Sequence, residues 1–193
     1  MLPMKYLRQL FAIAAALCLG LCHPSAEAQA LPTASGPGSY VSVGVALSTY
    51  QVDYGQRLLG GTSFFVDLQP TWRYGIEAEA RYLRLHTNEN VTESTYLAGP
   101  HIYVCHCGRW RPYGKFLVGQ GQLAFPFGYA HGTYLAYAPG AGVDIRITRY
   151  LSVRAIDVEY QSWPNFTYGN LHPYGISAGL NLRLNPLHQF PKR

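Results

Sequence analysis

Four residues near the middle of the chain have side chains that commonly bind metal ions: His101, Cys105, His106 and Cys107. In an extended strand His101 and Cys105 would lie about 13 Å apart. His106 would face away from both cysteines, because successive side chains of a strand point to opposite faces. These residues therefore do not converge on one ion, and we expect no metal site and no cofactor.

A hydroxyl and an imidazole near the end of the chain, Ser177 and His172, raise the question of a nucleophile activated by a base. Such a pair must share one face at hydrogen-bonding distance. The two residues are an odd number of positions apart, which places them on opposite faces of a strand. We therefore predict that the protein is not an enzyme.

Ten charged residues occur at alternating positions among small and polar neighbours, five of them acidic and five basic. They are Asp67, Glu77, Glu79, Arg81, Lys115, Asp144, Arg146, Arg154, Glu159 and Arg183. Charges that leave water persist when they are paired and hydrogen-bonded. The equal numbers favour a paired structural network over an ion-selective pore.

The elements that position these charges alternate with a period of two residues. In the last one, 174–184, large apolar residues alternate with Gly, Ser, Asn and Arg. This pattern predicts strands at 40–50, 62–73, 76–87, 96–105, 112–123, 133–147, 151–161 and 174–184. Pro70 predicts a bulge in the second strand, and a break in parity near Ile156 predicts another in the seventh.

The connections between these strands alternate in length. Long connections fall at 51–61, 86–95, 124–132 and 162–172, and short turns at 73–75, 106–111 and 148–150. This arrangement predicts an antiparallel up-and-down meander with all long loops at one end. Two loops contain aromatic residues that are candidates for contact with a partner: Phe125, Phe127 and Tyr129 in one, and Trp163, Phe166 and Tyr168 in the other.

The composition indicates which face meets which solvent. Charged residues make up 13% of the chain and aromatic residues 14%, whereas soluble domains average about 25% charged residues. Aromatic residues fall near the predicted strand ends: Tyr40, Trp72, Tyr74, Trp110 and Tyr150 at one end, and Tyr50, Phe64, Tyr96, Tyr160, Trp163 and Tyr174 at the other. Rings at both ends of strands are typical of the two interfaces of a membrane. We predict an all-β fold, an eight-stranded transmembrane β-barrel with its apolar face in lipid.

The first 30 residues have the features of a secretory signal peptide: Lys5 and Arg8, an apolar stretch from 10 to 22, and small residues at 26–30. We expect cleavage after about residue 28 to 30. A linker at 31–39, the barrel at 40–184 and a tail at 185–193 complete the predicted organisation. The net charge of +5 includes no long basic run, so nucleic acid is not an expected partner.

The last strand also resembles the β-signal of bacterial outer-membrane barrels, with Ser177, Gly179, Leu182 and Leu184 at the matching positions. It departs from that pattern by ending on Leu and by continuing into a tail. The segments 138–146, 151–154 and 159–161 are similar to the penultimate hairpin of the OmpA/OmpX-like family of eight-stranded outer-membrane barrels, and the resemblance covers about 38–184. It implies a place in the outer membrane of a diderm bacterium, contact with lipid and lipopolysaccharide, and insertion by the barrel assembly machinery.

These features favour a structural or surface-interaction role, adhesive in character, with an extracellular partner bound by the loops and no catalysis. Two alternatives remain at this point. One is a narrow channel for ions or solutes. The other is a secreted, lipocalin-like soluble barrel that holds a small apolar ligand, because a period of two residues does not say which face is inside.

Overall fold

The computed structural model describes residues 39–52, 57–84, 92–105, 107–124, 131–166 and 169–184. Antiparallel strands dominate this part of the chain: β1 (Tyr40–Val52), β2 (Arg57–Gln69), β3 (Tyr74–Arg84), β4 (Thr92–Tyr103), β5 (Trp110–Ala124), β6 (His131–Arg146), β7 (Leu151–Tyr160), β8 (Trp163–Phe166), β9 (Gly169–Leu171) and β10 (Tyr174–Leu184). Among the described residues no helix is long and apolar enough to cross a membrane. The signal peptide, the linker up to residue 38 and the tail predicted from the sequence lie outside the described residues.

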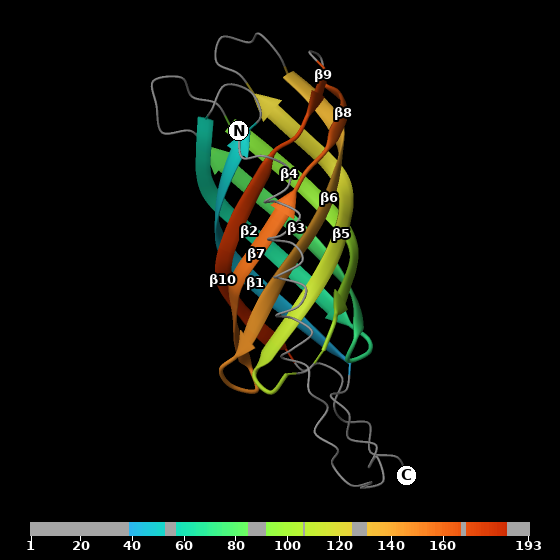
Figure 1. The fold of residues 1–193 in the computed structure, drawn as a ribbon, viewed down its shortest axis with the longest axis vertical. Coiled ribbons are helices and arrows are strands. Elements are labelled where there is room, and N and C mark those ends of the chain that lie inside the picture. The colour runs from blue at the N-terminus through green and yellow to red at the C-terminus, as the bar shows by residue number, and fades with distance from the viewer. Residues whose placement is uncertain are drawn as a thin grey trace, which may run out of the picture. The chain divides into compact units, whose positions relative to one another are not determined.

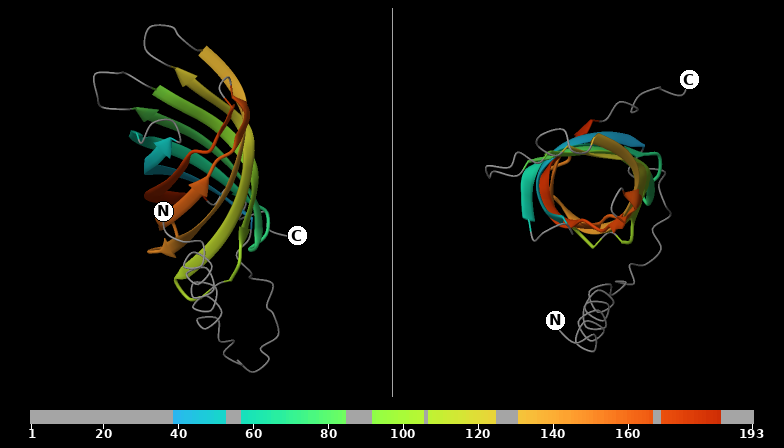
Figure 2. Two further views of the ribbon diagram at one scale, coloured as in Figure 1. Left: turned by 45° about the horizontal axis from the view of Figure 1, so that its top comes forward. Right: turned by 90° about the horizontal axis from the view of Figure 1, so that it is seen from above.

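Eight of these strands close into one barrel in the order β1-β10-β7-β6-β5-β4-β3-β2. The first and last strands meet along their whole length, from Val41 opposite Leu184 to Gln51 opposite Tyr174. Seen from above, the strands form a complete ring (Figure 2). The predicted eight-stranded up-and-down topology is confirmed.

The short turns are held by local hydrogen bonds. The Thr71 hydroxyl accepts a bond from the backbone N–H of Tyr74 (3.0 Å), and the Thr148 hydroxyl accepts one from Leu151 N–H (2.9 Å). Gly108 adopts a φ of +64° in the turn before β5, a conformation that side chains disfavour. All three turns lie at the lower end of the barrel (Figure 1), which we call the short-turn end.

Several strand bounds differ from the prediction. The second strand begins at Arg57 because Val52 of β1 pairs with it, and it ends at Gln69. Pro70 therefore lies in the turn and needs no ladder bond, so the bulge predicted there was wrong.

The bulge near Ile156 is confirmed: Val143 pairs with Ile156 and Asp144 with Arg154, which leaves Ala155 as the extra residue.

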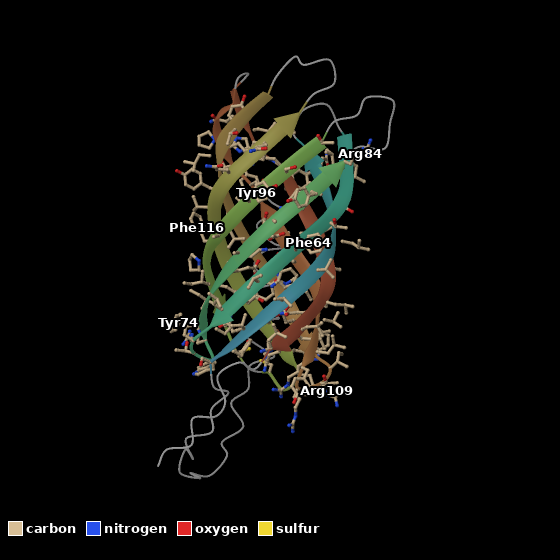
Figure 3. All side chains as sticks on the ribbon, turned by 180° about the vertical axis from the view of Figure 1, so that it is seen from behind. Phe64, Tyr74, Arg84, Tyr96, Arg109 and Phe116 are labelled. Atoms are coloured by element: carbon tan, nitrogen blue, oxygen red, sulfur yellow. The ribbon has the colours of Figure 1, made fainter. Side chains whose placement is uncertain are left out.

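The outer and inner faces of the barrel differ as the alternation requires. Large apolar side chains such as Val45, Phe64 and Leu180 are 42%, 55% and 51% exposed, and Phe64, Tyr96 and Phe116 point away from the wall (Figure 3). Ser, charged residues and a few Leu fill the inside. Most large apolar side chains are therefore on the outside of this barrel, and all described carboxylates are within it.

The aromatic residues predicted at the strand ends divide into two groups. Trp72, Tyr74, Trp110 and Tyr150 are exposed at the short-turn end, and Tyr96, Tyr160 and Tyr174 are exposed toward the long connections. Phe64 is exposed but lies near the middle of β2, so its assignment to a strand end was wrong. Tyr40, Tyr50 and Trp163 are buried instead. The first two have the inward parity of their strand, and Trp163 enters the lumen from β8.

Candidate functional site in the barrel lumen

The centre of the lumen is organised by Lys115 of β5. Its Nζ atom lies 2.7 Å from Asp157 Oδ2 and 3.1 Å from each of Glu77 Oε1, Glu79 Oε2 and Glu159 Oε2. The side chain has no exposed surface. One ammonium group is thus surrounded by four carboxylates that come from β3 and β7, the strands two places away on either side.

Arg154 of β7 lies beside this centre, nearer the short-turn end. Its guanidinium contacts Glu77 Oε2 at 2.8 Å, Asp157 Oδ2 at 3.3 Å and Asp144 Oδ1 at 3.5 Å. The plane stacks over the Phe65 ring, 3.7 Å from its centroid. Polar and cation–π contacts together satisfy a cation that has left water.

Arg81 of β3 extends the charged region toward the long-connection end. It donates to Glu159 Oε1 (2.8 Å) and Glu79 Oε1 (2.6 Å). Gln161 donates to the same Glu159 oxygen (2.9 Å), and Trp163 Nε1 donates to Gln161 Oε1 (2.8 Å). The three cations Lys115, Arg154 and Arg81 with their four shared carboxylates are called the lumen network below.

An apolar layer lies above the lumen network, toward the long connections. Its members are buried side chains from β2, β3, β4, β5 and β8: Leu59, Leu83, Leu97, Leu117, Leu123 and Trp163. The Trp163 ring stacks on Tyr134 with 6.4 Å between centroids. Gly121 faces this ring, and a Cβ atom at that position would overlap it. The lumen is therefore filled by charges at mid-height and by hydrocarbon above them.

Most of the charged residues singled out from the sequence lie in this lumen. Buried side chains are found at Asp67, Glu77, Glu79, Arg81, Lys115, Asp144, Arg154 and Glu159. Arg183 is half-buried and lies over the Tyr40 ring (3.9 Å). Arg146 is exposed, so its assignment to the lumen was wrong: it is the last residue of β6 and lies at the rim.

Sequence reasoning did not assign four further buried acidic, basic or imidazole side chains to the lumen: Asp157, Glu93, Arg111 and His101. Asp157 shares the parity of Glu159, which was a sufficient signal. Glu93 and Arg111 are the second residues of β4 and β5, and both strands begin earlier than predicted. The expected balance was also wrong, because the described residues bury seven carboxylates and only four Lys or Arg side chains.

The described residues contain one cluster with the donor types for a metal ion, namely Asp67, Glu77 and His101, whose ligand atoms lie within 4.8 Å of one another. Arg154 Nη2 already lies 2.8 Å from Glu77 and 3.7 Å from Asp67. The chain's own guanidinium thus takes the place that a cation would occupy. Cys105 and Cys107 lie in the turn before β5, away from His101, and His106 is outside the described residues.

The hydroxyl and imidazole that could have suggested catalysis lie in different environments. The buried Ser177 Oγ is 2.8 Å from Ser48 Oγ across the β1–β10 seam. His172 Nδ1 is 2.9 Å from the Tyr160 hydroxyl on the outer surface. The two residues do not form a nucleophile–base pair.

The remaining predicted sites are placed as follows. Of the β-signal residues, Leu182 and Leu184 face outward with 52% and 49% exposure, Ser177 faces the lumen, and Gly179 packs on the backbone of Val45. The loop candidates Phe125, Phe127, Tyr129 and Tyr168 and the side chain of Phe166 lie outside the described residues. Trp163 was wrongly taken for a loop contact, because it is completely buried in the lumen.

A closed ring of strands with an apolar outer face, a charged interior and all short turns at one end defines a transmembrane β-barrel. The chain belongs to the outer membrane protein beta-barrel domain family, whose model matches residues 14–183. It lies in the outer membrane of a diderm bacterium, in contact with membrane lipid, and its short turns face the periplasm. The secreted lipocalin-like alternative was therefore wrong.

Solved structures with the same fold include Neisserial surface protein A, which is 12% identical, covers 76% of this chain and 97% of its own, and has a TM-score of 0.64. The outer membrane protein AlkL in DMPC bilayers is 10% identical, with coverages of 86% and 99% and a TM-score of 0.54. OprG from Pseudomonas aeruginosa is 9% identical, with coverages of 77% and 96% and a TM-score of 0.53. At these identities the likeness concerns the fold alone. No curated protein matches the chain.

Proposed function

We propose that this protein is a closed outer-membrane barrel with a structural and surface-interaction role, adhesive in character, and without catalysis. The observation that supports the proposal most is the filled lumen, in which Lys115 is held by four carboxylates within 3.1 Å. A barrel that does not conduct, and in which Ser177 and His172 do not form a nucleophile–base pair, acts through its surfaces.

Two barriers in series oppose the passage of solutes. An ion crossing the lumen network would have to displace Lys115 or Arg154 from paired carboxylates, and a buried charge left without its partner costs several kcal/mol. The layer around Leu97, Leu117 and Trp163 lines the lumen mainly with hydrocarbon, which does not replace an ion's hydration shell. The buried carboxylate of Glu93, in register with Leu83 and Leu123, is a charged group at this height.

The surfaces on which the role depends are the loops and the last strand. Phe125, Phe127, Tyr129, Phe166 and Tyr168 are the residues we assign to contact with an extracellular partner or with lipopolysaccharide. The outward-facing Leu182 and Leu184, with Ser177 and Gly179, form the segment we assign to recognition by the barrel assembly machinery during insertion.

The test measures conductance and partner binding on the same preparations. Purified protein in planar bilayers should give no reproducible channel events. Deletion of 125–130 should leave insertion and heat-modifiable migration intact and reduce binding to whole cells or lipopolysaccharide. Deletion of 53–56, the connection between β1 and β2 at the same end of the barrel, is the control and should leave binding unchanged. Unchanged binding after deletion of 125–130 would exclude that loop as the contact surface.

A narrow channel is the second candidate, favoured by one observation. The described lumen holds more buried carboxylates than cations, and polar atoms such as Asp157 Oδ1 and Asn181 Oδ1 find no hydrogen-bond partner among the described residues. The same bilayer experiment separates the two functions. Reproducible conductance that changes with Lys115→Ala or Arg154→Ala, and not with loop deletion, would establish the channel.

A further inference from the structure

The described barrel buries all its acidic side chains, whereas its basic side chains are found both in the lumen and on the surface. All seven described carboxylates are buried. The exposed charged side chains are arginines: Arg73, Arg84, Arg109, Arg146 and Arg149. Four of these five are at the short-turn end, because only Arg84 closes a strand at the opposite end (Figure 3). The periplasmic rim is therefore cationic with no exposed acid among the residues that the structure describes.

Three of the rim arginines lie on one arc of the barrel wall. The backbone N–H of Arg146 donates to the carbonyl oxygen of Arg109 (2.9 Å), which places these two residues on adjacent positions of β6 and the turn before β5. Arg149 follows in the turn from β6 to β7. We call Arg109, Arg146 and Arg149 the arginine arc. Arg73 is on the separate β2–β3 turn, near the rings of Trp72 and Tyr74.

Exposed rings and an aliphatic side chain mark the depth of the arginine arc in the membrane. Trp110, Tyr150 and Ile147 are 56%, 58% and 51% exposed, and each is within one residue of an arc arginine in the sequence. Indole and phenol rings on the outside of a barrel favour the level of the lipid headgroups. The guanidinium groups next to them are at the same level, where lipid phosphates are found.

No carboxylate of the described chain neutralises the arc from within. The closest in sequence, Asp144, has no exposed surface and accepts a bond from the Tyr103 hydroxyl (2.8 Å) while contacting Arg154 (3.5 Å). Each arc arginine is thus free to offer its planar set of N–H donors outward. This fork matches the oxygens of a phosphate group in two parallel hydrogen bonds.

We propose that the arginine arc binds the phosphate groups of anionic phospholipids in the periplasmic leaflet of the outer membrane. The site is independent of the loops and of the closed lumen, so it does not depend on the function proposed above. It selects phosphatidylglycerol-like lipids over zwitterionic phosphatidylethanolamine, because the latter carries its own ammonium group. Bound lipid would fix the rotation and depth of the barrel at its periplasmic edge.

Native mass spectrometry of the full processed protein in a neutral detergent tests this directly. Phosphatidylglycerol and phosphatidylethanolamine are titrated separately onto the wild type and onto the triple variant Arg109→Gln, Arg146→Gln, Arg149→Gln. We expect the triple variant to lose tenfold or more of its phosphatidylglycerol affinity, because one basic residue near a membrane surface contributes roughly fivefold. Its weaker phosphatidylethanolamine binding should stay as it is. The corresponding triple Lys variant should keep most of the preference, since it keeps the charge.

The matched control is Arg84→Gln, which removes one exposed arginine from the opposite end. Arg109→Gln should weaken phosphatidylglycerol binding about fivefold and Arg84→Gln should not. This pair of single variants decides the matter if the triple variant does not give heat-modifiable, folded protein. The proposal would be overturned if the two single variants lost equal affinity for phosphatidylglycerol, or if a variant lost equal affinity for both lipids. Full displacement of the lipid by inorganic phosphate would also overturn it and would indicate a site for the free anion.

Discussion

Trp163 Nε1 donates a 2.8 Å hydrogen bond to Gln161 Oε1 inside the barrel, although both residues follow the last residue of β7. Gln161 in turn donates to Glu159, which is bonded to Arg81. The chain after β7 therefore returns its first side chains to the lumen before it forms the β8–β9 hairpin. This contact joins the apolar layer to the lumen network, so the two layers support each other.

Replacing Trp163 by Ala should lower the free energy of unfolding by about 3–5 kcal/mol, because it removes the largest apolar side chain of the lumen and leaves a cavity. Urea titration followed by heat-modifiable migration measures the change. Trp110→Ala, on the exposed periplasmic rim, is the matched control and should change stability much less. Similar losses in the two variants would show that Trp163 does not fill the lumen.

Gly121→Ala should lower the free energy of unfolding by about 1–3 kcal/mol, because its new methyl group would overlap the Trp163 ring. In a Trp163→Leu background the same change should have little effect. A double-mutant cycle of unfolding measurements checks this coupling. Additive effects would mean that Gly121 is required for the strand alone.

Lys115→Met should lower the free energy of unfolding by about 3–5 kcal/mol, because four buried carboxylates lose the cation they share. Urea titration in detergent micelles gives the value. Arg149→Gln also removes one cation but from the exposed rim, and it should leave stability almost unchanged. A stable Lys115→Met variant would contradict the charge network as a structural element.

Variants of Glu79 and Arg146 compare the stability contribution of a charge in the lumen with that of a charge at the rim. Glu79→Ala should destabilise the barrel strongly, since Glu79 bonds both Lys115 and Arg81. Arg146→Ala should have little effect, because its side chain is exposed. The midpoint of thermal conversion in heat-modifiable electrophoresis compares the two. The reverse order would require β6 to have a different register.

Leu180→Arg should cost about 2–4 kcal/mol of stability in lipid vesicles, the range for a cation on the lipid face near the middle of a barrel. Leu180 is 51% exposed and pairs with Val45 at the centre of the β1–β10 seam. Thr133→Arg, near the start of β6 at the long-connection end, should cost less, because its position is near the interface. Equal costs at the two positions would place the lipid belt elsewhere.

The sequence by itself determined the elements and the face on which each side chain lies. The alternation in 174–184 predicts the bounds of β10 as the structure has them. The parity break near Ile156 predicts the bulge at Ala155, because one extra residue reverses every side chain after it. The scarcity of charge indicates lipid outside, so the sequence alone assigns Asp67, Glu77 and Lys115 to the lumen.

Only the tertiary structure decided which of those side chains meet. Lys115 is on β5, while Asp157 and Glu159 are on β7 and Glu77 and Glu79 on β3. Their contacts cross the lumen between strands that are not neighbours. The distances between these side chains depend on closure of the ring and on the stagger of its strands, and neither property leaves a local pattern in the sequence. The wall of the barrel ends near Trp163 and Arg146. Its extent there decides that the Trp163 side chain enters the lumen and that the Arg146 side chain is exposed at the rim. A period of two residues assigns a side chain to a face, but the height of the barrel at that point decides whether the face is buried.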